Sequence, residues 1–261
     1  MVDSNLSIIL PCAGEGKRLG LSYPKELYEI CEGFRLVDFS LLHVKYQFNK
    51  NPELKIKIVV VIKKGKESVF EYVKKRLYPI EVVSVYFNDD YFEWAGSVYS
   101  ASDHFSEYNL VLLPDSALTF GKEDLFSKEN LSLLDTVYNS LMKNPAAFGI
   151  IRCDDRKKLK NLGACFVDNG VITRFKDKPK KYFDAYNSFW GCYAFKKEIA
   201  KRLYDFLVGS IKRRKTNYQD EIFYPFSSFF IDSYTDLGTW DSIENFKVSL
   251  TLQKFVRYNR V

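Results

Sequence analysis

The 261-residue chain lacks the features that mark several specialised classes of protein. Its apolar runs, such as residues 58–62, are far shorter than the about 20 residues that cross a bilayer, and no export signal opens the chain. Its five cysteines form no CxxC pair and show no zinc spacing. We therefore expect reduced thiols, a cytoplasmic location, no membrane association and no disulfide framework.

An excess of charge of one sign is also missing. The 39 basic and 33 acidic residues give a net charge of +6, spread along the chain. The densest basic run, residues 212–215, is interpreted as a solvated helix end rather than a contact for a polyanion, so we expect no nucleic-acid partner. Hydrophobic residues make up 46% of the chain, which is enough for a full core without disulfide or metal support.

What is present is an alternation of short apolar segments with helical patterns. The sequence predicts strands at residues 6–10, 57–62, 81–86, 110–113, 146–152, 164–167, 171–175, 189–195 and 229–234. It predicts helices at residues 36–48, 67–77, 96–105, 196–208 and 241–258. Asn169-Gly170 favours a tight hairpin turn, and Asp241 followed by Glu244 is interpreted as the N-cap of the last helix.

No repeat, low-complexity tract or linker interrupts this pattern. Strands separated by helices indicate βαβ units and a largely parallel sheet. We therefore expect one domain over residues 1–261, built as a three-layer α/β/α sandwich with a Rossmann-like, mixed and mainly parallel sheet.

A glycine-rich loop follows the first predicted strand, in residues 8–27 (IILPCAGEGKRLGLSYPKEL). Its glycines let the backbone approach a phosphate closely, and successive N–H groups form a nest for an anion. Arg18 and Lys25 can add a forked donor and a point charge. The spacing is neither G-x-G-x-x-G nor that of a Walker loop, and a structural turn with two surface cations is the alternative.

At this loop the sequence resembles a known family. GEGKR at residues 14–18, followed by Pro24-Lys25, resembles the signature loop of the sugar-1-phosphate nucleotidylyltransferases, although PCAG stands where many members have LAGG. The resemblance implies that the loop wraps a nucleoside triphosphate and that Arg18 and Lys25 are catalytic, holding its phosphates. The nucleotide-binding residues of the loop would be Ala13, Gly14 and Gly16.

Two further segments of the resemblance carry acids. LVLLPDS ends at Asp115, which matches an Mg²⁺-binding Asp of the family, and the usual companion acid is replaced by Ala117. DLGT places Asp236 at the family's second metal position. The resemblance therefore implies Mg²⁺ as cofactor, bound by Asp115 and Asp236, while each Asp could instead cap a turn or helix.

The stretch at residues 161–181 resembles the family's acceptor side, with a Gly, a hairpin and an acid-Lys-Pro triplet. The resemblance implies that Gly163, Asp177 and Lys178 bind the acceptor, with Lys178 holding its phosphate as a third catalytic residue. Asp177 stands where the family has Glu, which shortens the reach to sugar hydroxyls by one methylene. A plain surface lysine is the alternative for Lys178, since other basic residues surround it.

The stretch at residues 92–101 (FEWAGSVYSA) matches the family's base-binding segment. Gly96 and Ser97 are expected to open a helix and to face the base or ribose. Glu93, as a carboxylate, can accept from an exocyclic amine, which favours cytosine over thymine. Trp94 is interpreted mainly as a core residue.

The function implied by the resemblance is Mg²⁺-dependent in-line attack of a sugar-1-phosphate on an NTP, which forms an NDP-sugar and releases pyrophosphate. Residues 1–120 would form the nucleotide-binding half, and residues 121–261 the acceptor-binding half with the C-terminal helix. Partners would be the NTP and the phosphorylated acceptor, and a homo-oligomer is left open. The length leaves no room for an appended β-helix, so a bifunctional acetyltransferase is not expected.

Three alternatives remain open from the residues alone. One is a cytidylyltransferase for a non-sugar phosphate or phosphonate. Another is a catalytically silent nucleotide-binding subunit, which only Ala117 supports. A dehydrogenase would need an acid at the end of a second strand, whereas Asp38 opens a helical pattern.

Overall fold

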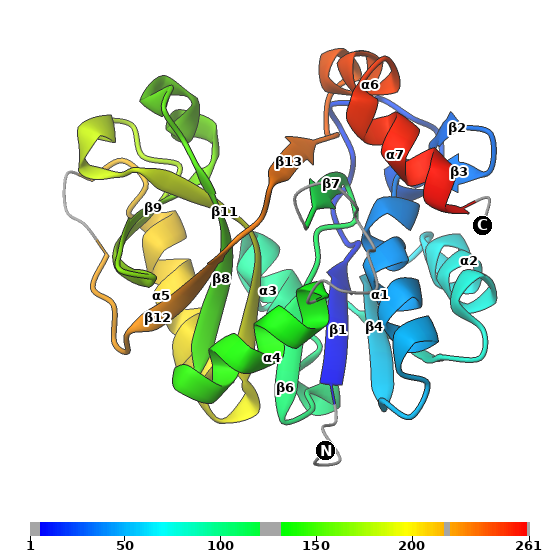
Figure 1. Ribbon diagram of the computed structural model, residues 1–261, viewed down its shortest axis with the longest axis horizontal. Helices are drawn as coiled ribbons and strands as arrows, with labels where there is room; N and C mark the ends of the chain where they lie inside the picture. Colours follow the sequence, from blue (N-terminus) through cyan, green and yellow to red (C-terminus); the bar gives the residue numbers. More distant parts are fainter. Residues whose placement is uncertain (1–5, 121–131, 217–219, 260–261) are drawn as a thin grey trace.

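One nine-stranded sheet runs through the computed structural model, which describes residues 6–120, 132–216 and 220–259 (Figure 1). Its strand order is β5-β4-β1-β6-β11-β8-β12-β10-β9, so residues before and after 120 share the sheet. The strands are β1 Leu6–Pro11, β4 Ile56–Ile62, β5 Glu81–Tyr86, β6 Tyr108–Val111, β8 Ala146–Arg152, β9 Gly163–Asp168, β10 Val171–Asp177, β11 Ser188–Lys196 and β12 Phe226–Phe230.

The sheet is mixed, as expected from the sequence. The strands β5, β4, β1 and β6 pair in parallel, and β12 is parallel to β8. The β11 strand runs antiparallel to both β6 and β8, and β10 runs antiparallel to β9 and β12. Parallel pairing therefore dominates the first half only, because β9 and β10 form a hairpin and β11 runs back between β6 and β8.

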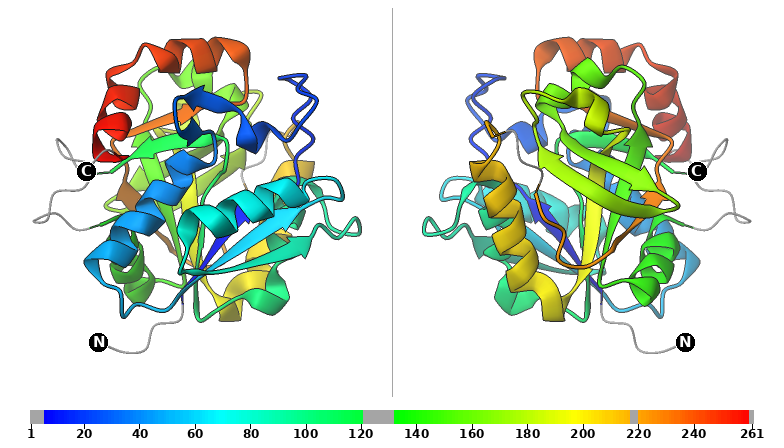
Figure 2. Two further views of the ribbon diagram at one scale, coloured as in Figure 1. Left: turned by 90° about the vertical axis from the view of Figure 1, so that its right-hand side faces the viewer. Right: turned by 90° about the vertical axis from the view of Figure 1, so that its left-hand side faces the viewer.

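Helices cover both faces of this sheet and give the expected three layers. One face carries α1 Asp38–Lys50, α2 Glu67–Leu77 and α4 Leu133–Lys143, and the other carries α3 Glu93–Tyr99 and α5 Ala200–Lys212. The right-hand view of Figure 2 shows α4 (green) and α5 (yellow) on opposite sides of the sheet. Alternation along β1 builds both cores, since Ile8 and Leu10 join one apolar cluster and Ile9 the other.

Two small sheets and a helical pair complete the fold beside the end of β1. The strands β2 Glu29–Cys31 and β3 Phe34–Arg35 form a hairpin that lies against α6 Trp240–Lys247 and α7 Leu250–Asn259 (Figure 1). The strands β7 Ser116–Thr119 and β13 Ser233–Asp236 form an antiparallel pair. Short 3-10 turns occur at Lys25–Leu27, Ser102–His104, Arg156–Asn161, Phe183–Ala185 and Lys197–Ile199.

The predicted strand at residues 229–234 is wrong, because it is two strands in two sheets. Between β12 and β13, the Ile231 amide donates to Ile150 of the large sheet and the Asp232 amide to Thr119 of β7. The apolar pattern is continuous, but the chain changes sheets at this point. The hairpin turn is confirmed, since Asn169 and Gly170 both have positive φ, 46° and 78°.

Two helix predictions also need correction. The C-terminal helix is two helices, and the first is capped by Thr239 with Ser242 in a capping box, rather than by Asp241 with Glu244. The helix predicted at residues 96–105 begins three residues earlier, at Glu93, and ends at Tyr99. In the described part of the chain, no helix is both long and apolar enough to cross a membrane.

His43 on α1 is fully buried in neutral surroundings, which makes the fold sensitive to acid. Burial lowers its pKa to about 4, although its Nε2 lies 3.1 Å from the Leu118 carbonyl oxygen. The unfolded chain binds a proton at His43 below about pH 6.5, whereas the folded chain does not until about pH 4, so this window costs stability on acidification. His43→Gln is expected to reduce the stability loss between about pH 7 and pH 5 by about 2 kcal/mol, measured by urea unfolding. An unchanged pH dependence in the variant would contradict this.

Candidate active site

Two ion pairs lie side by side where β1 and β6 end. Lys25 is paired with Asp115, and Arg18 lies 3.9 Å from Asp236. The β7–β13 ladder explains this proximity, because it sets Asp236 opposite Ser116, the residue after Asp115. The Leu237 amide also donates to the Asp115 carbonyl at 2.8 Å. The small two-stranded sheet, rather than the edge of the large one, thus brings the two predicted metal ligands together.

The glycine loop folds back so that Lys25 lies beneath it. Gly16 has φ +67°, a conformation that favours glycine, and the Lys25 side chain packs against it, where a Cβ would lie 3.4 Å away in ordinary van der Waals contact. Burial acts to lower the pKa of Lys25, but Asp115 and Glu26 outweigh it and raise the pKa. Lys25 is therefore a fixed positive charge, whereas the Arg18 side chain is 61% exposed and free to meet a ligand.

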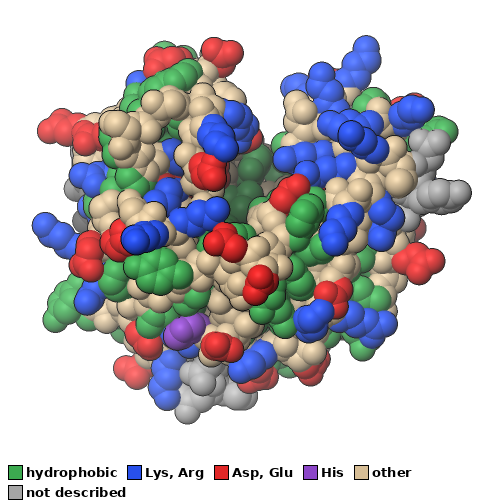
Figure 3. Space-filling view, turned by 180° about the vertical axis from the view of Figure 1, so that it is seen from behind, with side chains coloured by type: hydrophobic (Ala, Val, Ile, Leu, Met, Phe, Trp, Pro, Cys, Tyr) green, Lys and Arg blue, Asp and Glu red, His purple; other side chains and the backbone are tan. Residues whose placement is uncertain are grey.

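A pocket of about 360 Å³ opens beside these pairs and gathers most of the predicted nucleotide-binding residues. It is lined by Pro11, Ala13, Gly14, Glu15, Lys25, Lys63, Phe87, Glu93, Trp94, Ser97, Leu113, Pro114 and Asp115. Figure 3 shows the molecule hollowed at this end, with Lys and Arg side chains on the rims. The buried Ser97 hydroxyl has no hydrogen-bond partner among the described residues, so it is available to a ligand in the pocket.

Glu93 and Gly96 each make a structural contact that the sequence did not reveal. Glu93 has φ +48°, and its carboxylate accepts from Arg214 Nη1 at 3.2 Å. Gly96 lies against its own preceding turn, where a Cβ would come within 2.6 Å of the Tyr91 carbonyl carbon. Gly96 therefore has a packing reason to be glycine, and Glu93 is held by a cation from the other half of the chain.

The predicted acceptor residues lie together on the β9–β10 hairpin. Gly163 pairs with Asp177 across the two strands, and a Cβ on Gly163 would come 1.8 Å from Trp190 Nε1. Lys178 follows directly, with φ +47° and its amide bonded to the Leu162 carbonyl. A non-glycine residue in this conformation is strained, and such strain is common at functional sites.

Asp177 is not open to solvent, because Arg214 covers it. Its carboxylate accepts from Arg214 Nε, and its amide donates to the Ser210 hydroxyl at 2.9 Å. Burial raises the pKa of Asp177, and Arg214 partly offsets this. Arg214 thus joins Asp177 of the predicted acceptor side to Glu93 of the first pocket.

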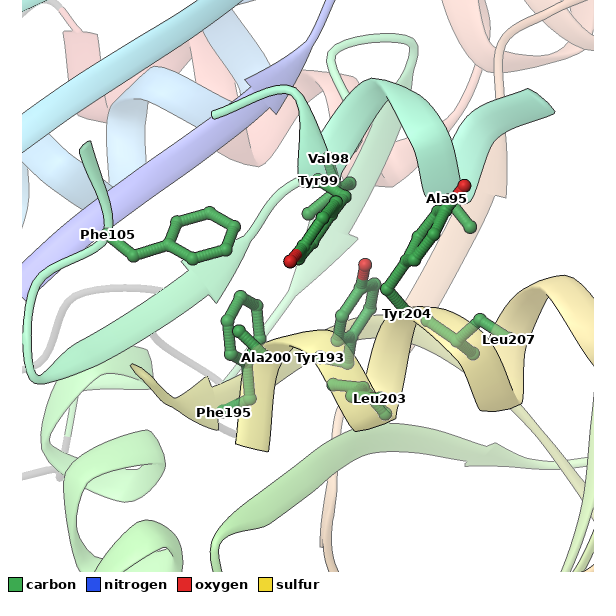
Figure 4. A pocket seen from close by; sticks show the side chains of 10 residues that line it. All are labelled: Ala95, Val98, Tyr99, Phe105, Tyr193, Phe195, Ala200, Leu203, Tyr204 and Leu207. Carbon is green, nitrogen blue, oxygen red and sulfur yellow. The ribbon is translucent and has the colours of Figure 1, made fainter. Parts of the chain in front are cut away.

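A second pocket, of about 510 Å³, lies on the other side of Asp236. It is lined by Arg152, Cys153, Asp154, Asp155, Lys158, Leu162, Phe189, Tyr234 and Asp236. Lys25 and Asp115 line the first pocket and Asp236 lines the second, so the two ion pairs border both pockets. By contrast, the apolar crevice between α3 and α5, where Tyr99 stacks on Tyr204, holds only about 10 Å³ and admits no ligand (Figure 4).

The sequence did not identify three residues that shape this site, namely Arg214, Glu26 and Lys66. The interpretation of residues 212–215 as a solvated helix end is wrong for Arg213 and Arg214, since Arg213 pairs with Asp220 and Arg214 with Asp177. The density of basic residues in that run was the available sequence signal for Arg214. Glu26 and Lys66 form an ion pair whose partners lie 40 residues apart, and no local pattern marks them.

Asp115 and Asp236 form a donor set that suits Mg²⁺. This cation is commonly held by one or two carboxylates together with substrate phosphates and water. Within the described residues, no group of three or more acidic, His or Cys side chains could hold a metal without such help. The residues present therefore fit a cation that binds together with a nucleotide. Without a cation, Lys25 and Arg18 balance the charge of the two carboxylates.

Known proteins share this architecture. A protein of Bacillus anthracis that is described as a glucose-1-phosphate thymidylyltransferase superposes on this chain with a TM-score of 0.64, at 16% identity over 93% of each chain. UDP-glucose pyrophosphorylase of Acinetobacter baumannii superposes with a TM-score of 0.66, at 16% identity over 98% of each chain. The inositol-1-phosphate CTP transferase of T. maritima gives 0.63 at 17% identity over 92% of this chain and 91% of its own.

At these identities the likeness shows the fold, and no curated protein matches the chain by sequence. The family is shown by the sequence profile of the nucleotidyl transferases, which matches residues 6–253 and so includes the glycine loop, both acidic positions and the acceptor hairpin. With a match over nearly its whole length, the chain belongs to the nucleotidyl transferase family.

Proposed function

We propose that the protein couples an NTP to a sugar-1-phosphate, releasing pyrophosphate and forming an NDP-sugar. The observation that carries this proposal is the placement of the Lys25–Asp115 and Arg18–Asp236 pairs at the border of two pockets of ligand size. One pocket takes the nucleotide, and the other takes the body of the acceptor. The reacting phosphates then meet at the ion pairs.

The residues of the chain perform this reaction mainly by positioning and charge neutralisation, since phosphoryl transfer demands little covalent chemistry of the protein. The glycine loop, Arg18 and Lys25 bind the triphosphate and neutralise the departing pyrophosphate. Lys178 holds the acceptor phosphate, which the nucleotide would otherwise repel. Asp115 and Asp236 would hold Mg²⁺, which would supply charge neutralisation to the phosphates. The acceptor oxygen then attacks the α-phosphorus in line with the leaving pyrophosphate.

The neighbouring structures support this choice of acceptor, since their names refer to glucose-1-phosphate, UDP-glucose and inositol-1-phosphate. Two observations favour a second candidate, a cytidylyltransferase for a non-sugar phosphate. The Asp177 carboxylate is covered by Arg214 and so is not free for sugar hydroxyls. Glu93 lines the nucleotide pocket, and although it is paired with Arg214, its side chain is 42% exposed and can accept from the amine of cytosine.

A single panel tests both candidates. Pyrophosphate release is measured with each of the four common NTPs against sugar-1-phosphates, inositol-1-phosphate, amino-alcohol phosphates and phosphonates, with Mg²⁺ present. Turnover with sugar-1-phosphates supports the first candidate, and turnover only with CTP and a non-sugar acceptor supports the second. NTP binding without turnover for every acceptor would indicate a silent binding subunit and would contradict both.

Lys178→Ala is expected to weaken use of the acceptor more than use of the NTP. Removal of one charge-assisted contact to a phosphate costs roughly 1.5–3 kcal/mol, which is about 10- to 150-fold in the acceptor KM. Both KM values are measured by pyrophosphate release, with Lys181→Ala, a nearby exposed lysine, as control. A raised NTP KM with an unchanged acceptor KM would mean that the two pockets are assigned in reverse.

A further inference from the structure

Lys66 reaches from the N-terminus of α2 into the underside of the glycine loop. Its Nζ donates to the carbonyl oxygens of Cys12 and Gly14, each at 2.6 Å. It also donates to both carboxylate oxygens of Glu26 at 2.9 Å. The Lys66 side chain is 13% exposed and that of Glu26 is fully buried, so this is an inner contact of the site.

These contacts fix the direction of two peptide units. In a planar trans peptide the C=O of one residue and the N–H of the next point in opposite directions. With the carbonyls of Cys12 and Gly14 held on Lys66, the amides of Ala13 and Glu15 point away from it. Neither amide donates to another described residue, and Ala13, Gly14 and Glu15 all line the nucleotide pocket. Lys66 thus turns two free N–H donors toward the place of the phosphates.

Lys66 itself has no capacity left for a substrate. An ammonium group has three N–H donors, and four oxygen atoms already surround this one. Glu26 balances its charge and belongs to the same turn, Lys25–Leu27, as Lys25. The pair therefore links the loop amides to Lys25 in one rigid unit.

We propose that Lys66, together with Glu26, is a positioning residue that sets the affinity of the glycine loop for the triphosphate and for pyrophosphate. The inference rests on the proposed function, since it assigns the loop to NTP phosphates. It predicts a specific kinetic pattern, in which binding of NTP and pyrophosphate is weakened and binding of the acceptor is not.

The test compares Lys66→Met, Lys66→Arg and the control Lys64→Met, an exposed lysine two residues away. Lys66→Met is expected to raise the NTP KM and the pyrophosphate inhibition constant at least about tenfold, while the acceptor KM changes less than about twofold. Lys66→Arg, which keeps the donors, is expected to recover part of the loss, and Lys64→Met to match the wild type. NTP binding by calorimetry, without acceptor, gives the same comparison independently of turnover.

Lys66→Met leaves the buried Glu26 without its partner and can therefore lose its fold. The double variant Lys66→Met/Glu26→Gln removes that charge and carries the same expectation. An NTP KM within twofold of the wild type in the folded variant, or equal rises in both KM values, would overturn the inference. A wild-type protein that binds NTP but turns over no acceptor would instead overturn the proposed function, while the binding comparison still decides on Lys66.

Discussion

Asp115→Asn and Asp236→Asn are each expected to lower kcat at least about 10²–10³-fold, the usual cost of losing a group that stabilises charge in the transition state. If both carboxylates hold one cation, removal of either carboxylate loses most of the effect of that cation on kcat. The double variant should therefore be little worse than either single one, because groups that act as a unit are not additive.

The measurement is kcat by pyrophosphate release across Mg²⁺ concentrations, together with thermal unfolding. Unfolding matters here because Asp115→Asn leaves the mostly buried Lys25 without its partner. Asp232→Asn, an exposed carboxylate just before β13, is the matched control and should retain wild-type activity. Additive losses in the double variant would contradict a shared ion, and activity that survives removal of all divalent metal would contradict the mechanism.

Lys25→Ala and Arg18→Ala are expected to lower kcat by about 10²–10³-fold. Thermal unfolding is measured with the rates, because Lys25→Ala leaves the mostly buried Asp115 without its partner. In the proposed reaction, both cations would face the phosphates on which negative charge develops as pyrophosphate leaves. Lys25 should show the larger loss, because it is buried against Asp115 and needs no reorganisation, whereas Arg18 is largely exposed.

Single-turnover and steady-state rates separate this effect from weaker NTP binding. Lys17→Ala is the matched control, since Lys17 lies in the same loop, is 84% exposed and pairs only with Glu15 in the described part of the chain. Activity within a few-fold of the wild type in both Lys25→Ala and Arg18→Ala would remove the phosphate-binding role from the loop.

The elements that could be predicted from the sequence are those with a strong local pattern. Helix α2 and strands β5 and β8 have the predicted bounds, because their apolar residues repeat at helical or strand spacing between clear turn residues. The Asn169-Gly170 hairpin follows from turn chemistry alone. Where a continuous apolar stretch serves two sheets, as at β12 and β13, local pattern does not reveal the change of partner.

The sequence by itself also determined the family, since the glycine loop, two acids and the acceptor triplet occur in the matching order. The tertiary structure decided how these residues face each other. It set Asp236 beside Asp115 through a four-residue ladder, covered Asp177 with Arg214, and placed Lys66 under the loop. Such contacts join residues 37 to 121 positions apart, and their strength comes from burial and geometry that exist only once the chain is folded.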